Sequence, residues 1–164
     1  MTDPEEGIPA AAVPSAEPVA EAGAGTLTAP DAATIAALAE VARDALPDPI
    51  RAAAGDVALR VAEFAPEEVI RSLGAADAFE ITGLYDGTPL TQRGASLESG
   101  ELPPTVWLYR RAILDEWAAR PGVTLGALVG HILVHEIAHH FGWSDAEIAE
   151  IDRWWDWQEE EDAP

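Results

Sequence analysis

The chain has 164 residues, a length that suits one compact domain flanked by tails. Its formal net charge of −21 argues against nucleic acid and anionic membranes as partners, because basic surfaces bind both. Cysteine is absent, so any metal ion must be held by nitrogen and oxygen ligands. No segment reaches the roughly 18 apolar residues that predict a membrane span, and the N-terminus lacks the positive charges of a secretory signal. These missing signals predict a bacterial-type cytoplasmic location.

The composition changes along the chain and predicts three regions. Residues 1–30 are rich in Ala, Pro, Glu and Gly and have few bulky apolar side chains, so they predict a disordered tail. Residues 31–157 carry the apolar pattern of a folded domain, and residues 158–164 form an acidic tail. Three tryptophans near the C-terminus predict either core packing or a partner-binding surface: Trp154, Trp155 and Trp157. The sequence carries no signal for the oligomeric state.

Helical and alternating apolar spacings, bounded by Pro and Gly, predict the elements of the domain in chain order. The first are a helix from the N-cap Asp31 to Pro47, an added turn over 50–54, a strand over 56–64 and a helix over 66–74. Then come a strand over 78–85, closed by the Asp86-Gly87 turn signal, a long loop over 88–103 and a strand over 105–110. The last are a helix over 113–120, a long helix over 124–141 and a helix opened by the capping box of Ser144 and Glu147. This order predicts an α+β domain, with a small sheet covered by helices.

All four histidines of the chain fall within ten residues of the long predicted helix. His135, Glu136 and His139 form the pattern H-E-x-x-H, which Gly142 and Asp145 extend to H-E-x-x-H-x-x-G-x-x-D. On a helix, residues four apart emerge on one face about 6 Å apart along the axis, so two imidazoles can reach one ion. The motif therefore predicts a zinc site built on His135 and His139.

Glu136 and the residues after the helix complete this pattern. Glu136 lies about 100° around the helix from His135, so it can reach a water on the ion without being a ligand itself. Gly142 permits the left-handed turn that would direct a third ligand back to the ion. Asp145 is suited to be that ligand and leaves a fourth position open, as catalytic zinc requires. Alternatively, Asp145 only complements the dipole of the helix that follows.

The other two histidines are predicted to be neighbours of the metal rather than ligands. A straight helix spreads His131, His135 and His139 over about 12 Å, which is too far for one ion. We expect His131 to be a partly buried polar residue or to support a ligand. His140 is rotated about 100° from His139 and is expected to point away from the ion. There it could hydrogen-bond a neighbouring element or contact substrate.

Three segments of the chain resemble a family of small bacterial zincin-like metallopeptidases, also described as minimal zincins. They are residues 135–142 with Asp145, residues 83–93 with the pattern Gly-Leu-Tyr-acidic-Gly-x-Pro-Leu, and residues 102–110. The resemblance covers residues 33–152. It implies a zincin-like domain with a small mixed sheet packed by helices and an active-site helix.

The same resemblance implies a role for each residue of the motif. It implies zinc ligation by His135, His139 and Asp145, with Glu136 as the catalytic acid and base. Larger relatives with similar ligand spacing have a methionine turn under the metal. This chain lacks that turn, because its only methionine is Met1.

The leading functional hypothesis is hydrolysis of peptide bonds with one zinc ion and with Glu136 as general base. The strand over 105–110 could be an edge that binds an extended peptide; it could also be a paired core strand that buries Val106 and Leu108, and the two interpretations are compatible. Tyr109 is a candidate hydrogen-bond donor to the transition state. Two other functions stay open: a zinc-binding interaction module without turnover, and a zinc hydrolase of a non-peptide amide. Two histidines and one carboxylate also suit iron and other divalent ions.

Overall fold

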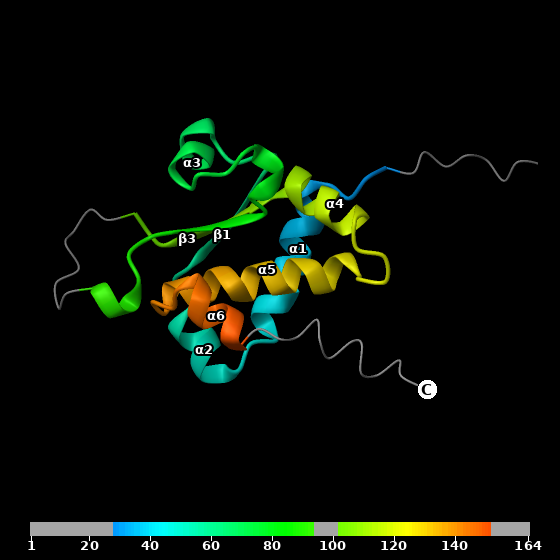
Figure 1. The fold of residues 1–164 in the computed structure, drawn as a ribbon. Coiled ribbons are helices and arrows are strands. Elements are labelled where there is room, and N and C mark those ends of the chain that lie inside the picture. The colour runs from blue at the N-terminus through cyan, green and yellow to red at the C-terminus, as the bar shows by residue number, and fades with distance from the viewer. Residues whose placement is uncertain (1–27, 94–101, 152–164) are drawn as a thin grey trace, which may run out of the picture.

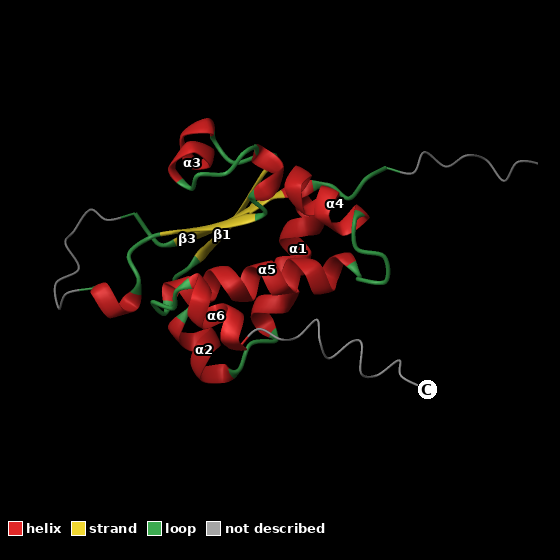
Figure 2. Ribbon diagram, in the orientation of Figure 1, coloured by secondary structure: helices red, strands yellow, loops and turns green. Residues whose placement is uncertain are grey.

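The computed structural model describes residues 28–93 and 102–151 (Figure 1, Figure 2). Most of the predicted tail over 1–30, all of the acidic tail over 158–164 and the three C-terminal tryptophans lie outside the described residues. So do residues 94–101 of the predicted loop over 88–103. The described residues form helices and a small mixed sheet, which confirms the predicted α+β class.

Side-chain caps and prolines set the boundaries of the first elements. The elements in chain order are α1 (Ala32–Asp44), α2 (Asp48–Ala53), β1 (Ala58–Ala62), α3 (Glu67–Ser72), the 3₁₀ turn η1 (Ala78–Glu80), β2 (Gly83–Asp86), the 3₁₀ turn η2 (Leu90–Gln92), β3 (Thr105–Tyr109), α4 (Arg110–Ala118), α5 (Leu125–His140) and α6 (Asp145–Ile151). The Asp31 carboxylate accepts the Thr34 backbone N–H at 2.8 Å and begins α1, as predicted. Pro49 lies in the first turn of α2, a position that tolerates proline, so the predicted turn over 50–54 belongs to a helix.

The strand predicted over 78–85 is wrong in its first half. The Asp77 carboxylate accepts the Phe79 backbone N–H at 2.8 Å and caps the turn η1, which bends the chain. Extended backbone begins only at Gly83, and β2 includes Asp86, which the sequence assigned to a turn. Alternation of apolar residues could not reveal this, because a side chain competes locally for the backbone donor that a strand would use.

The three strands form a mixed sheet in the order β1-β3-β2. The central strand β3 pairs in parallel with β1 and antiparallel with β2, so both of its sides are occupied. The interpretation of residues 105–110 as a peptide-binding edge is therefore wrong. The alternative is confirmed, since Val106 and Leu108 are both fully buried. Among the described strands, the free edges belong to β1 and β2.

Two apolar clusters cover the two faces of the sheet. On one face Val106 and Leu108 pack with residues of α1 and α5 in the larger cluster. On the other face Tyr109 packs in a smaller cluster that Val69 and Ile70 of α3 adjoin. Successive side chains of β3 point to opposite faces of the sheet, which explains why Leu108 and Tyr109 belong to different clusters. The result is that α5 lies under the sheet and contacts β2 and β3.

The remaining boundaries shift by a few residues from their predictions. The helix expected over 113–120 is α4, which begins directly after β3 at Arg110. The predicted long helix is α5, which the Thr124 hydroxyl caps by accepting the Ala127 N–H at 3.1 Å. Within residues 28–93 and 102–151, no helix combines the length and apolar character needed to cross a membrane.

Candidate metal centre and cleft

The motif histidines and Asp145 lie together at the C-terminal end of α5. The Nε2 atoms of His135 and His139 lie 3.1 Å and 3.0 Å from the same Asp145 oxygen. One ligand atom from each of the three residues lies within 4.8 Å of the other two. The two histidines are partly buried, whereas the Asp145 side chain is 82% exposed. The structure thus brings together the three residues that the motif predicts as metal ligands.

The turn after α5 directs Asp145 back toward the histidines. Gly142 has a φ of +86°, the left-handed conformation expected of it. The Trp143 backbone N–H donates to the Ala138 carbonyl at 3.2 Å, which closes the turn. The next helix, α6, begins with the predicted capping box, since the Ser144 backbone N–H donates to the Glu147 carboxylate at 2.7 Å. Asp145 therefore both begins a helix and faces the two imidazoles.

A main-chain contact sets the orientation of His139. The Nδ1 atom of His139 lies 2.8 Å from the Trp143 carbonyl oxygen. A carbonyl only accepts, so Nδ1 carries the hydrogen, and the neutral ring keeps at Nε2 the lone pair that a metal ion between His139 and Asp145 would bind. Such outer contacts are typical of metal-binding histidines, because they select the tautomer and hold the ring in place. The donor set of two imidazole nitrogens and one carboxylate oxygen therefore fits a divalent metal ion.

Glu136 is buried beside this group, with 9% of its surface exposed. Burial raises the pKa of its carboxyl, although the neighbouring His135 and His139 and a hydrogen bond from the Tyr85 backbone N–H act in the opposite direction. The strand β2 lies very close to this side chain. A Cβ atom added to Gly83 would lie 3.1 Å from the Glu136 Cγ and 2.8 Å from the Ile132 Cγ2. A larger residue would force the Ile132 side chain to shift, so Gly83 lets the strand lie close to α5 and to the Glu136 carboxylate.

The other two histidines are neighbours of the group, as predicted. His131 is partly buried. Burial and the nearby His135 and Arg120 lower its pKa to about 4, so it is neutral near pH 7. His140 is fully buried and points away from the other imidazoles. Burial also lowers the pKa of His140.

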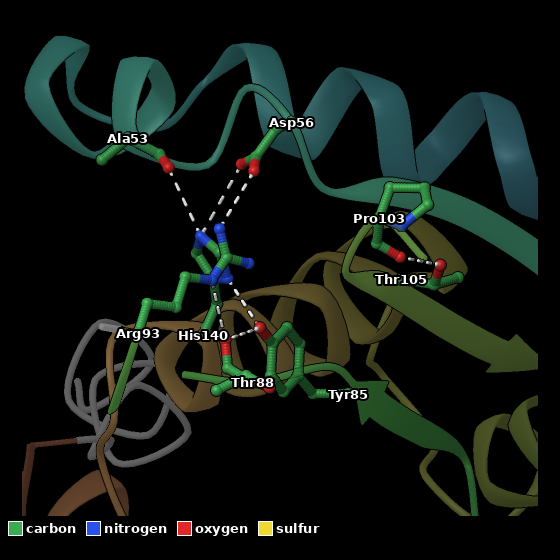
Figure 3. Close-up of polar contacts among 8 residues, drawn as sticks. All are labelled: Ala53, Asp56, Tyr85, Thr88, Arg93, Pro103, Thr105 and His140. Atoms are coloured by element: carbon green, nitrogen blue, oxygen red, sulfur yellow. Dashed lines mark hydrogen bonds and ion pairs between the residues drawn. The ribbon is translucent and has the colours of Figure 1, made fainter. Parts of the chain in front are cut away.

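His140 belongs to a polar cluster that sequence reasoning did not find (Figure 3). The Tyr85 hydroxyl lies 2.7 Å from His140 Nδ1, and the Ala53 carbonyl oxygen lies 3.4 Å from Nε2. Arg93 pairs with Asp56 at 3.3 Å on the side of the cluster nearest α2. The Gly-Leu-Tyr segment that resembles the family was the one sequence feature that includes Tyr85. Nothing in that segment revealed that its tyrosine contacts the helix that carries the motif.

A cleft of about 970 Å³ opens over the metal-binding group. Its walls include β2 with the residues just before it, the histidine-bearing face of α5 and the turn over 142–145. Residues 73–75, together with Glu116 and Arg120, also line it. Tyr109 does not line this cleft; it is buried in the smaller core cluster, and burial raises its pKa to about 12. Its predicted role as a donor to the transition state is not supported by this position.

A helix that presents two imidazoles and a buried carboxylate to a cleft, beneath the free edge of a small sheet, defines a zincin-type site. The family model described as zincin-like metallopeptidase matches residues 54–155. This span exceeds half of the chain, and the protein belongs to that family. No curated protein matches the chain. Family membership makes metal-dependent hydrolysis the first function to consider.

Proposed function

We propose that the protein is a zinc-dependent peptidase in which His135, His139 and Asp145 hold the ion and Glu136 acts as general base. The observation that carries the proposal is the convergence of three ligand atoms within 4.8 Å of one another beside a buried carboxylate at a cleft. Membership in a metallopeptidase family supports it. When bound, zinc supplies Lewis-acid polarisation of a carbonyl and makes water acidic enough to react near neutral pH.

Glu136 is suited to take a proton from the attacking water and to deliver it to the leaving amine. Burial raises the pKa of Glu136, which moves it toward the range in which a carboxyl exchanges protons efficiently near neutral pH. The Tyr85 backbone N–H bonds to the Glu136 carboxylate and limits the positions that the side chain can adopt. The low exposure of Glu136 also keeps bulk water away from the proton that it holds.

The free edge of β2 is the surface along which an extended peptide would bind. The Tyr109 N–H donates to the Thr82 carbonyl at 2.9 Å, so in this antiparallel pair residues 82 and 84 bond to β3. The main-chain groups of Gly83 and Tyr85 alternate with these and therefore point away from β3. A peptide that pairs with this edge would share the cleft with Glu136, so an open cleft along β2 favours peptides over small amides.

The decisive experiment compares Glu136→Gln with the wild-type protein on a mixed pool of unstructured peptides. We expect the variant to cleave about 10²- to 10⁴-fold more slowly, the usual contribution of a general acid–base group. Cleavage is measured by mass spectrometry, and the zinc content of both proteins is matched by elemental analysis. Glu68→Gln removes the same charge from an exposed position of α3 that does not line the cleft, and it serves as the control.

Three outcomes would contradict this proposal in different ways. Equal rates for Glu136→Gln and wild type would remove Glu136 from the role of base. Stoichiometric zinc with a stable bound partner and no cleavage of any peptide would favour an interaction module. Hydrolysis of small amides without cleavage of peptides would favour a zinc hydrolase of non-peptide amides.

A further inference from the structure

We propose that Tyr85 and His140 form a positioning pair that holds the strand β2 at its working distance from the motif helix α5. This inference rests on the proposed function, because the group that it positions is Glu136 and the strand edge beside it. Neither residue belongs to the group of three candidate metal ligands, and the pair acts through β2. It joins a side chain of β2 directly to a side chain of α5 by a hydrogen bond.

The first step is the contact itself. The Tyr85 hydroxyl lies 2.7 Å from His140 Nδ1, and the His140 side chain has no exposed surface (Figure 3). The His140 Nε2 atom faces the Ala53 carbonyl oxygen at 3.4 Å. Because that carbonyl only accepts, Nε2 carries the hydrogen and Nδ1 accepts from the Tyr85 hydroxyl. The Tyr85 hydroxyl also lies 3.2 Å from the Thr88 carbonyl oxygen, so its one hydrogen is shared between that oxygen and the nearer Nδ1 in a partly buried contact.

The second step is that the partners of this bond are themselves held. His140 lies on the last turn of α5, and its ring extends toward Ala53 at the end of α2 (Figure 3). Asp56 lies 3.9 Å from His140 Nε2 and pairs with Arg93, whose Nε also donates to the Thr88 carbonyl at 3.0 Å. Residues 53–56 and the strand β2 therefore meet at this imidazole of α5, and the Tyr85 phenol is bound to a side chain that is itself held by neighbouring segments.

The third step connects this bond to the Glu136 carboxylate. The Tyr85 backbone N–H donates to Glu136, so the same residue binds α5 at two points: with its main chain at Glu136 and with its hydroxyl at His140. Two residues earlier, Gly83 lies so close to α5 that an added Cβ would be 2.8 Å from the Ile132 Cγ2 and 3.1 Å from the Glu136 Cγ. A small shift of β2 would break the hydrogen bond between the Tyr85 N–H and Glu136, or would push Gly83 against α5. The bond between the Tyr85 phenol and the His140 imidazole opposes that shift.

The last step concerns the reason why the edge strand β2 needs a bond that fixes its position relative to α5. β2 spans only Gly83–Asp86 and has a partner strand on one side alone. A short edge strand depends on contacts with the layer beneath it for its exact position. Displacement of a catalytic group by about 1 Å can lower a rate by as much as 10²-fold, so a link that fixes this position has a kinetic consequence.

The experiment compares Tyr85→Phe with Thr105→Val in the full chain loaded with zinc. Tyr85→Phe removes only the hydroxyl. Thr105→Val is the control, since it removes a hydroxyl on the neighbouring strand β3 together with its hydrogen bond to the Pro103 carbonyl at 3.1 Å, whereas Tyr85→Phe removes the bonds to His140 and to the Thr88 carbonyl. We expect Tyr85→Phe to lower kcat about tenfold per folded, zinc-loaded molecule, with KM changed much less. Thr105→Val should leave both constants near wild type.

A second readout does not depend on activity. In the NMR spectrum of zinc-free protein, the amide of residue 85 should exchange faster with solvent in Tyr85→Phe, whereas amides between β1 and β3 should keep their protection. If no peptide is cleaved even by the wild-type protein, the proposed function fails but this measurement still tests the positioning pair. Unchanged exchange of the residue 85 amide would overturn the pair, and so would an unchanged kcat.

Exchange of His140 for Asn or Leu separates positioning from general loss of packing. An Asn side chain can place an acceptor near the former Nδ1 position, whereas Leu cannot. His140→Asn should therefore retain more of the wild-type kcat and more protection of the residue 85 amide than His140→Leu. Equal losses in the two variants would mean that His140 only fills space, which contradicts the proposal.

Discussion

At the residue scale, Asp145 has the role that the sequence could least decide. Its position at the start of α6 suits a residue that complements a helix dipole. Its carboxylate nevertheless lies about equally close to two imidazole nitrogens, at 3.1 Å and 3.0 Å. The dipole of α6 requires only a negative charge near the start of the helix. A metal ion also requires that a carboxylate oxygen of Asp145 points toward the two histidines. The geometry supports the ligand role, which a measurement of zinc binding can test directly.

We expect Asp145→Ala to lower zinc affinity by at least about tenfold, because loss of a ligand should cost no less than loss of an outer contact. Affinity is measured by competition with a chromophoric chelator at pH 7. Asp115→Ala removes an equal charge from the exposed surface of α4 and should bind zinc as the wild-type protein does. If the two variants bind zinc equally well, Asp145 only begins α6.

At the scale of elements, the contact between β2 and α5 is the feature that the sequence did not reveal. Periodicity identified both segments as ordered, but it placed β2 too early in the chain and did not show which strand was at the edge. Pairing partners depend on contacts between residues far apart in sequence, such as Tyr85 opposite Val106. The peptide-binding edge was therefore assigned to the wrong strand.

Gly83→Ala tests how tightly these two elements are packed. The added methyl would lie 2.8 Å from the Cγ2 of Ile132, a buried side chain that has little room to move. We expect a loss of about 1–3 kcal/mol in the free energy of unfolding, measured by urea denaturation of the zinc-free protein.

Gly130→Ala on the same helix provides the contrast. Its Cβ would lie 3.5 Å from that of Ala42, an ordinary contact distance. The substitution should raise the free energy of unfolding by about 0.5–1 kcal/mol, because alanine favours the helix more than glycine. A Gly83→Ala protein as stable as wild type would show that β2 can move away from α5 without cost.

At the scale of the whole molecule, the main feature is the excess of negative charge, −21 at pH 7. The chain has 30 acidic residues and nine arginines, so most carboxylates have no basic partner. Several of the arginines that are described form ion pairs with exposed partners, among them Arg93 with Asp56 and Arg110 with Glu63. Exposed pairs contribute little to stability, so the repulsion among the remaining carboxylates should outweigh them.

We therefore expect added sodium chloride to raise the thermal unfolding midpoint of the zinc-free protein. Raising ionic strength from roughly 0.01 M to 0.1 M shortens the screening length from about 30 Å to about 10 Å and weakens this repulsion. The measurement is calorimetry at pH 7, with potassium chloride at equal ionic strength as the control for specific ion effects. A midpoint that falls with salt would mean that the attractive pairs dominate.

The sequence by itself determined the features that depend on local spacing. The pattern of His135, Glu136 and His139 needs only the helical repeat to place the three side chains near one another, and Gly142 needs only its tolerance of positive φ. The caps formed by Asp31 and Ser144 are local for the same reason. The α+β class followed from the order of the elements.

Only the tertiary structure decided which segments far apart in sequence meet. In the structure β3 is the central strand, Gly83 of β2 lies close to Glu136, and the Tyr85 hydroxyl forms a hydrogen bond with His140. None of these contacts has a signature in the spacing of residues, because each depends on how separate elements pack around a common core.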